Sequence, residues 1–113
     1  MANAEANTKA KANDNLRCYM GFAMRAGKCR AGDFIAEKLV KTRKASLILL
    51  DEAASESTKQ RYRELCDRAG IPCLTMENMG QPIGKDGRMV AAVTDAHFAQ
   101  MIQGAYEASK QAE

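Results

Sequence analysis

Apolar side chains recur at helical spacing in four parts of the chain. The first stripe, which begins at Leu16, predicts a helix that ends near Gly27. The other three predict helices over about 33–43, from a capping box at 57–60 to Gly70, and from a cap at Thr94 or Asp95 onward. One or two further helical turns are expected near 77–81.

Short apolar runs between the helical stripes predict buried strands at 46–50, 71–74 and 89–93. Strands that alternate with helices favour an α/β domain with helices on both faces of the sheet. Residues 1–15 show no apolar periodicity, which predicts a flexible N-terminal tail before a single domain over 16–113. The sequence has neither an apolar run of membrane-spanning length nor a signal-peptide core, so we expect a cytoplasmic protein without membrane contact.

The net charge of +3 is small but unevenly distributed. Residues 17–44 hold eight basic residues against two acidic ones, whereas residues 45–113 hold seven basic and ten acidic ones. A local positive field attracts polyanions and steers their approach. A solvated basic face is the simpler interpretation of such a run, so the charge has to be weighed with other features.

Motifs for catalysis and for metal binding are weak. The stretch Gly80–Lys85 has three residues between its glycines, where a Walker phosphate loop needs four and a Ser or Thr after the lysine. We interpret Asp51 and Glu52 as solvent-exposed acids, because adjacent carboxylates at a strand end point in different directions. The four cysteines lack a C-x-x-C pair and there is one histidine, so we expect reduced thiols, no metal, no cofactor and no enzyme. A small-molecule-binding domain is disfavoured because no glycine-rich cofactor loop has the right spacing.

The second predicted helix carries the candidate binding chemistry. Phe34, Lys38 and Lys41 stand at i, i+4 and i+7, so they share one face. An aromatic ring beside two ammonium groups suits nucleic-acid bases and phosphates. Phe34 as a core residue at a helix start is the competing interpretation.

The start of the same helix is a candidate phosphate site. Its free N–H groups and positive dipole end follow Gly32, which allows a ligand to approach the backbone closely. Lys28 and Arg30 precede it and add positive charge. Asp33 is expected to cap the helix or to accept a hydrogen bond from a base.

An ordered series of short motifs resembles one family. The series comprises Ala26-Gly27-Lys28, Gly32, Lys38, Lys41–Ala45, Leu47–Leu50, Thr58-Lys59, Gly70-Ile71-Pro72, Met79-Gly80, Ile83-Gly84-Lys85 and Val90–Asp95 with Phe98. It resembles the kink-turn RNA-binding ribosomal proteins (large-subunit proteins seven-Ae and thirty-e), most of all their small bacterial cytoplasmic members, over about 16–103. The resemblance implies a three-layer α-β-α sandwich and a non-enzymatic, RNA-binding role tied to ribosomes or translation.

The resemblance also assigns contact residues. In the family the second helix begins Gly-x-Asn-Glu-x-x-Lys, so Phe34 and Ile35 stand where Asn and Glu read guanine edges, and strict kink-turn readout does not follow. The family's other contacts map to the loop Gly84–Met89 and to Glu52. The predicted RNA-binding residues are therefore Lys28, Arg30, Gly32, Asp33, Phe34, Ile35, Lys38, Lys41, Glu52, Lys85, Arg88 and Met89.

The partner predicted in this way is structured RNA, ribosomal RNA included, with ribosomal proteins as further candidates and no DNA. The alternative is a protein-interaction module on the same fold that docks on a ribosomal protein or a translation factor. The loss of the Asn-Glu pair is the observation that favours this alternative.

Overall fold

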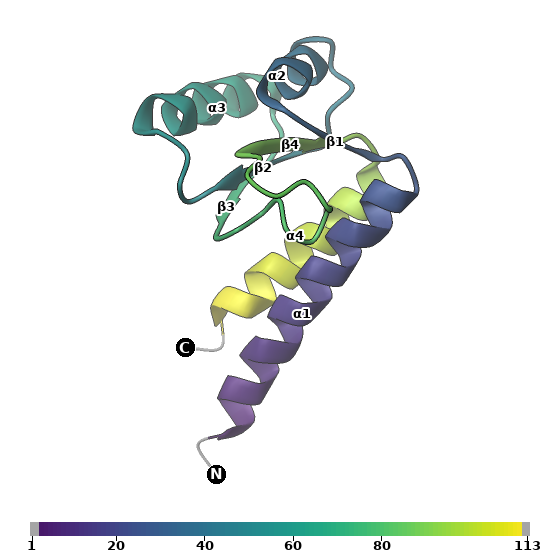
Figure 1. The fold of residues 1–113 in the computed structure, drawn as a ribbon, viewed down its shortest axis with the longest axis vertical. Coiled ribbons are helices and arrows are strands. Elements are labelled where there is room, and N and C mark those ends of the chain that lie inside the picture. Colours follow the sequence, from purple (N-terminus) through teal and green to yellow (C-terminus); the bar gives the residue numbers. More distant parts are fainter. Residues whose placement is uncertain (1–2, 112–113) are drawn as a thin grey trace.

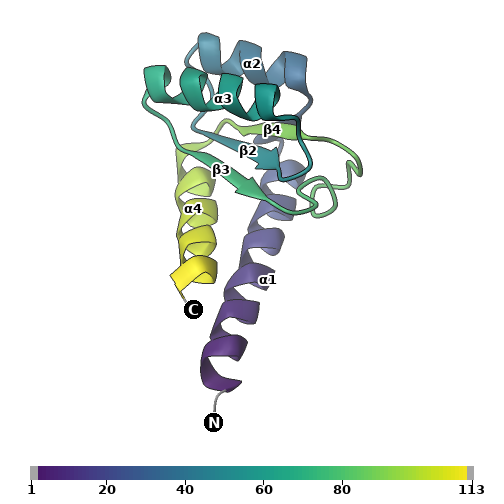
Figure 2. The same ribbon diagram turned by 90° about the vertical axis from the view of Figure 1, so that its left-hand side faces the viewer.

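Two pairs of helices enclose a four-stranded sheet in three layers (Figure 1). The structure is a computed structural model that describes residues 3–111, and the side chains of residues 10–110. Its elements are α1 (Asn3–Arg25), β1 (Cys29–Ala31), α2 (Asp33–Lys41), β2 (Leu47–Asp51), α3 (Glu56–Ala69), β3 (Cys73–Met76), β4 (Val90–Val93) and α4 (Ala96–Gln111). Figure 2 shows α2 and α3 on one side of the strands and α1 and α4 on the other.

The strands lie in the order β1-β4-β2-β3, with β2 and β3 parallel and β4 antiparallel to both of its neighbours. Cys29 of β1 and Leu47 of β2 both pair with Val93, so these two strands begin at the same end of the sheet. We call this the Val93 end. The opposite end, the Val90 end, carries the last residues of β1, β2 and β3 and the loop that leads into β4. Because a crossover helix starts where its first strand stops, α2 and α3 both begin at the Val90 end.

Each face of the sheet has its own apolar core. The side facing α1 and α4 is built from Leu16, Met20, Leu47, Leu49, Ala91, Val93 and Ile102, among others. The side facing α2 and α3 is built from Ala36, Val40, Ile48, Leu50, Tyr62, Val90 and Ala92, among others. Strands β2 and β4 are buried on both faces, which explains their uninterrupted apolar sequences. The predicted α-β-α sandwich is confirmed.

Local chemistry confirms two predicted helix boundaries and corrects a third. Gly70 ends α3 in the left-handed conformation, with φ 71°. Asp95 caps α4, because its Oδ1 accepts a hydrogen bond from the Phe98 N–H at 2.8 Å. The cap of α3 lies two residues earlier than predicted, at Ser55, whose Oγ accepts from the Thr58 N–H at 3.2 Å.

Three predictions of secondary structure differ from the structure. Strand β1 was not predicted, because three residues are too few to show a period of two. Residues 77–81 form turns instead of a helical turn. The predicted tail is helical from Asn3, since alanine favours helix and the buried Ala12 extends the apolar stripe of α1 by one turn; residues 1 and 2 lie outside the described part. Within the described residues no helix has the length and apolarity needed to cross a membrane.

Candidate nucleic-acid interface

The start of α2 is shaped by Gly32. This residue has φ 126° and ψ 143°, a backbone conformation that residues with a side chain rarely adopt. Its N–H donates to the Val90 carbonyl at 2.9 Å, which ties the helix start to the first residue of β4. Among the described residues no side chain caps α2, so the first N–H groups of the helix stay available to a ligand.

Asp33 does not cap α2 as predicted, because α3 holds its carboxylate. Arg61 donates to Asp33 Oδ2 at 2.7 Å, and the Tyr62 hydroxyl donates to Asp33 Oδ1 at 2.5 Å and to the Asp33 carbonyl at 2.8 Å. The hydrogen bond from Arg61 lowers the pKa of Asp33. Burial, followed by the bond to Asp33, raises the pKa of Tyr62, which therefore stays a neutral donor.

A second carboxylate extends this network along α2. Glu37 accepts from Arg61 and, at 2.8 Å, from Lys41. The bond from Lys41, with that from Arg61, lowers the pKa of Glu37. The charge of Lys41, which we predicted to meet RNA, is thus largely balanced within the protein. Arg61 bridges α2 and α3 and fixes the direction in which the first turn of α2 faces.

Phe34 is a surface residue and not part of the core. Its side chain is 85% exposed, which is unusual for a large apolar group. A hollow of about 550 Å³ runs beside it and is lined by Asp33, Phe34, Glu37, Lys38, Lys41, Thr42 and Arg61. The predicted shared face of Phe34, Lys38 and Lys41 is confirmed as geometry. Among the side chains that the structure describes, Lys38 forms no ion pair.

The loop before β4 lies against the start of α2. A shallow hollow of about 300 Å³ between them is lined by Gly32, Asp33, Thr58, Gly87, Arg88, Met89 and Val90. A β-carbon added to Gly32 would lie 3.7 Å from Arg88 Nη1 and 3.6 Å from Ile35 Cγ2. The structure therefore brings together two segments that the resemblance assigned separately, the helix start and the loop.

Buried hydrogen bonds hold this loop in shape. Asp51 is only 6% exposed, and its two carboxylate oxygens accept from the N–H groups of Ala53 at 2.8 Å and Met79 at 3.1 Å. Our interpretation of Asp51 as a solvent-exposed acid was wrong, because the turn after β3 depends on it. Further along, the Lys85 N–H donates to the Gly80 carbonyl at 2.9 Å.

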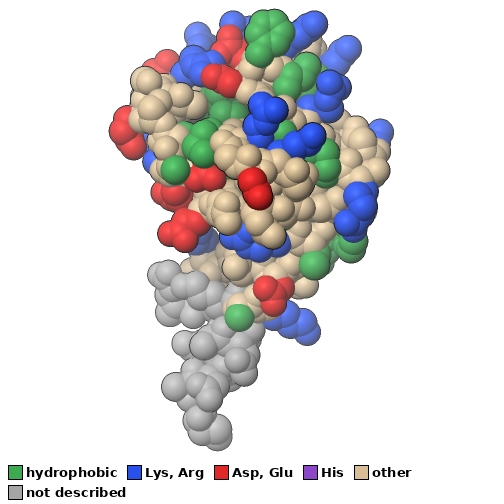
Figure 3. Space-filling view, in the orientation of Figure 1, with side chains coloured by type: hydrophobic (Ala, Val, Ile, Leu, Met, Phe, Trp, Pro, Cys, Tyr) green, Lys and Arg blue, Asp and Glu red, His purple; other side chains and the backbone are tan. Residues whose placement is uncertain are grey.

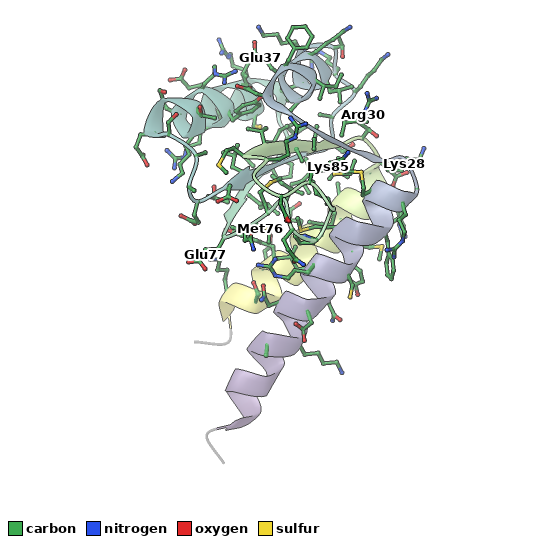
Figure 4. The ribbon with its side chains drawn as sticks, viewed as in Figure 1. Lys28, Arg30, Glu37, Met76, Glu77 and Lys85 are labelled. Atoms are coloured by element: carbon green, nitrogen blue, oxygen red, sulfur yellow. The ribbon has the colours of Figure 1, made fainter. Side chains whose placement is uncertain are left out.

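Two predicted residues lie apart from this surface. Glu52 lines a different hollow, of about 500 Å³, which α1 and α4 help to form. Lys28 belongs to the turn between α1 and β1 at the Val93 end, and Figure 4 shows it at the right-hand edge of the molecule, near Arg30 of β1. Thr58 was missed as a lining residue, although the Ser55-x-x-Thr58 cap indicates that it lies at the start of α3.

Sequence comparison places the chain in a family. It is 35% identical over 86 residues to the RNA-binding protein YlxQ of Bacillus subtilis (strain 168), which covers 74% of this chain and 86% of that protein. The RNA-binding protein YlxQ of Enterococcus faecium is 31% identical over 92 residues, which covers 75% and 88%. The chain belongs to the YlxQ family. No protein-family model matches the chain.

Solved structures share the fold of this YlxQ relative. A protein with unknown function from Bacillus halodurans C matches with a TM-score of 0.78 and 26% identity, covering 81% of this chain and 96% of that one. A 15.5kD RNA binding protein from Giardia lamblia matches with a TM-score of 0.71 over 88% of this chain and 90% of that one. The identity to this protein is 17%, so the likeness is one of fold alone.

Proposed function

We propose that the chain is a non-enzymatic RNA-binding protein of the cytoplasm, associated with ribosomes or translation, and that it binds structured RNA, kink-turns included, at the Val90 end. The observation that carries this proposal is the exposed ring of Phe34 beside Lys38, next to an uncapped helix start that Arg88 faces across a shallow hollow. The YlxQ relatives, which are named as RNA-binding proteins, support it.

Each group on this surface has a different task in the proposed complex. Lys38, Lys85 and Arg88 neutralise phosphates, and the first N–H groups of α2 bind a phosphate oxygen. Gly32 lets the RNA backbone approach closely, and Phe34 stacks on an unpaired base. Because Asp33 already accepts bonds from Arg61 and Tyr62, base-specific hydrogen bonding is a small part of the recognition.

A binding titration tests the proposal. The probe is a ribosomal RNA hairpin with an internal kink-turn, titrated from 50 to 300 mM salt. If about four phosphates are neutralised, log K falls with log salt at a slope near −3. We expect the double variant Lys38→Ala, Arg88→Ala to bind at least tenfold more weakly, because two phosphate contacts are lost.

A matched control separates the site from overall charge. The double variant Arg63→Ala, Lys110→Ala removes two exposed cations from α3 and α4 and changes the net charge equally. We expect it to bind the hairpin almost as well as the unmodified protein. An equal loss in both double variants, or an affinity that does not depend on salt, overturns the proposal.

The rival function is a protein-docking module on the same fold. The exposure of Phe34 fits this function as well, because aromatic side chains are frequent anchors of protein interfaces. Two results together would favour this function. The unmodified protein would bind no RNA at 50 mM salt, and it would capture a ribosomal protein or translation factor that the Phe34→Ala variant fails to capture.

A further inference from the structure

The fold divides the basic segment into two groups. Helix α2 begins at the Val90 end and delivers the chain to the start of β2 at the Val93 end. Arg43 and Lys44 therefore lie in the α2–β2 turn at the Val93 end, where the α1–β1 turn brings Arg25 and Lys28. The Thr94 N–H donates to the Lys28 carbonyl at 2.8 Å, and the Ser46 N–H donates to the Val93 carbonyl at 2.7 Å, so β4 joins the two turns. We call Arg25, Lys28, Arg43 and Lys44 the Val93-end cluster.

The charges of the Val93-end cluster face solvent. All four residues are exposed, and none of them forms an ion pair with another side chain that the structure describes. Figure 3 shows Lys and Arg side chains gathered over the upper and right-hand parts of the surface, with Asp and Glu mainly on the left. Asp95, the nearby acid, is engaged as the cap of α4.

Compensation of helix dipoles accounts for only part of this charge. Helices α1, α2 and α3 end at the Val93 end, where α4 begins, and each helix terminus carries roughly half a charge. The four cations of the cluster exceed the net negative charge of these termini by about three charges, and by about two when Asp95 is included. The excess is a positive surface beyond what the fold itself requires.

Arg43 stands where glycine fits better. It follows the C-cap Thr42 with φ 61°, a left-handed conformation that favours glycine after a helix. The surrounding backbone enforces this conformation, since the N–H groups of Lys44 and Ala45 both donate to the Leu39 carbonyl, at 2.9 and 3.0 Å. A charged residue in a strained position is typical of a site where the side chain has a function.

We propose that the Val93-end cluster is a second RNA-contact surface, which binds the phosphate backbone of a duplex without reading bases. Its chemistry is mainly Lys and Arg, and the partly exposed ring of Phe22 has the Arg25 guanidinium 5.1 Å from its centroid. The Val90 end, by contrast, offers an exposed ring and helix N–H groups for unpaired RNA. The choice of RNA as the polyanion rests on the proposed function, while the location of the second surface does not.

Two surfaces at opposite ends of the sheet allow one molecule to hold two parts of an RNA. The four residues of β4 separate the ends by about 10 Å at roughly 3.4 Å per residue. A stem can then lie along the Val93 end while its loop or kink occupies the Val90 end. Affinity for a hairpin with a stem therefore exceeds affinity for the unpaired segment alone.

Two probes and two variants test this proposal. The probes are a blunt RNA duplex of 12 base pairs and a single-stranded RNA of 10 nucleotides, each at 50 mM salt. We expect the double variant Lys28→Ala, Lys44→Ala to bind the duplex about tenfold more weakly, with a salt slope less steep by about two. The double variant Lys38→Ala, Arg88→Ala is expected to lose affinity for the single strand and to keep affinity for the duplex.

The variant Arg43→Gly separates function from folding. Glycine removes a duplex contact and relieves the left-handed strain, so we expect a higher thermal midpoint together with weaker duplex binding. If Arg43→Gly and the double variant Lys28→Ala, Lys44→Ala both bind the duplex as tightly as the unmodified protein, the proposal of a second surface is overturned, even if the unmodified protein binds the single strand. If Lys28→Ala, Lys44→Ala and Lys38→Ala, Arg88→Ala weaken single-strand binding equally, the assignment of duplex and unpaired RNA to different ends of the sheet is overturned. A cluster that binds poly-glutamate but not the duplex is a protein-docking surface, which also overturns the proposal.

Discussion

The guanidinium of Arg88 lies against Gly32, close enough that a β-carbon on the glycine would lie 3.7 Å from Nη1. Arg88 belongs to the loop before β4, and Gly32 precedes the first residue of α2. The Gly32 N–H bond to Val90 joins the same two segments through their backbones. The start of α2 and the loop therefore form one surface, whose shape depends on the φ of 126° at Gly32, which a residue with a side chain rarely adopts.

Replacing Gly32 by alanine should cost both stability and RNA binding. The φ of 126° is accessible to glycine and strained for alanine, so we expect the free energy of unfolding to fall by about 1–3 kcal/mol. The backbone at the helix start would shift to relieve this strain, whereas the added β-carbon itself makes only ordinary contacts with Arg88 and Ile35. Urea denaturation followed by circular dichroism measures the first effect, and a titration with the kink-turn hairpin measures the second.

Gly104→Ala is the matched control for this substitution. Gly104 lies in α4 with open space around its Cα, so alanine should stabilise the protein by about 0.5–1 kcal/mol through helix propensity. If the Gly32→Ala protein is as stable as the unmodified one, the start of α2 does not require a positive φ at position 32.

Gly80 tests whether the loop before β4 is held by close packing. A β-carbon at Gly80 would lie 2.3 Å from the Lys85 carbonyl oxygen, a distance that forces the backbone to shift. We expect Gly80→Ala to destabilise the protein by about 1–3 kcal/mol, as overpacking does elsewhere. Amide hydrogen exchange at Lys85 and Arg88 should become faster, because their N–H bonds to Gly80 and Lys85 are the ones disturbed. Unchanged exchange at both amides would contradict this account of the loop.

The layer structure was predictable because each element carries its own signal. Strand β2 reads as an uninterrupted apolar run, and Gly70 and Asp95 mark helix ends through local chemistry. Strand β1 was not predicted, because its three residues form a strand only by pairing with β4, which lies about 60 positions further along the chain. Asp51 was misjudged for a related reason, since the N–H of Met79 that explains its burial is 28 residues away.

The candidate site was predictable in its parts but not in its arrangement. A count of charges along the chain treats residues 17–44 as one group, whereas the crossover through α2 sends Lys44 to the end of the sheet opposite Gly32. The ion pair between Glu37 and Lys41 is an i, i+4 pair, so sequence spacing indicates it, although a count of charges along the chain does not. Long-range pairs, such as Arg61 with Asp33, decide which charges remain free for a ligand.

Phe34 should matter for RNA binding and hardly at all for stability. Its ring is 85% exposed, so we expect Phe34→Ala to change the free energy of unfolding by less than about 0.5 kcal/mol. Loss of one stacked base should weaken binding of a 10-nucleotide single-stranded RNA by about 1–3 kcal/mol. Phe22→Ala is the control, because that ring lies on α1 under Arg25. Equal effects of the two variants on single-strand affinity would exclude stacking by Phe34.

The bridge from Arg61 to Asp33 and Glu37 should make stability depend on acidic pH. Hydrogen bonds lower the pKa of both carboxyls below their ordinary values of 3.8 and 4.5, so the folded state binds protons less readily than the unfolded state. Their contribution is therefore present above about pH 4.5 and is lost as the pH falls through the lowered pKa values. We expect Arg61→Gln to cost about 1 kcal/mol at pH 7, since these groups are partly exposed, and to flatten the decline in acid. Urea unfolding between pH 7 and pH 3 measures both effects, and Arg63→Gln on the same helix is the control. If the free energy of unfolding falls with pH in the same way for the Arg61→Gln and unmodified proteins, the bridge does not link α2 to α3 energetically.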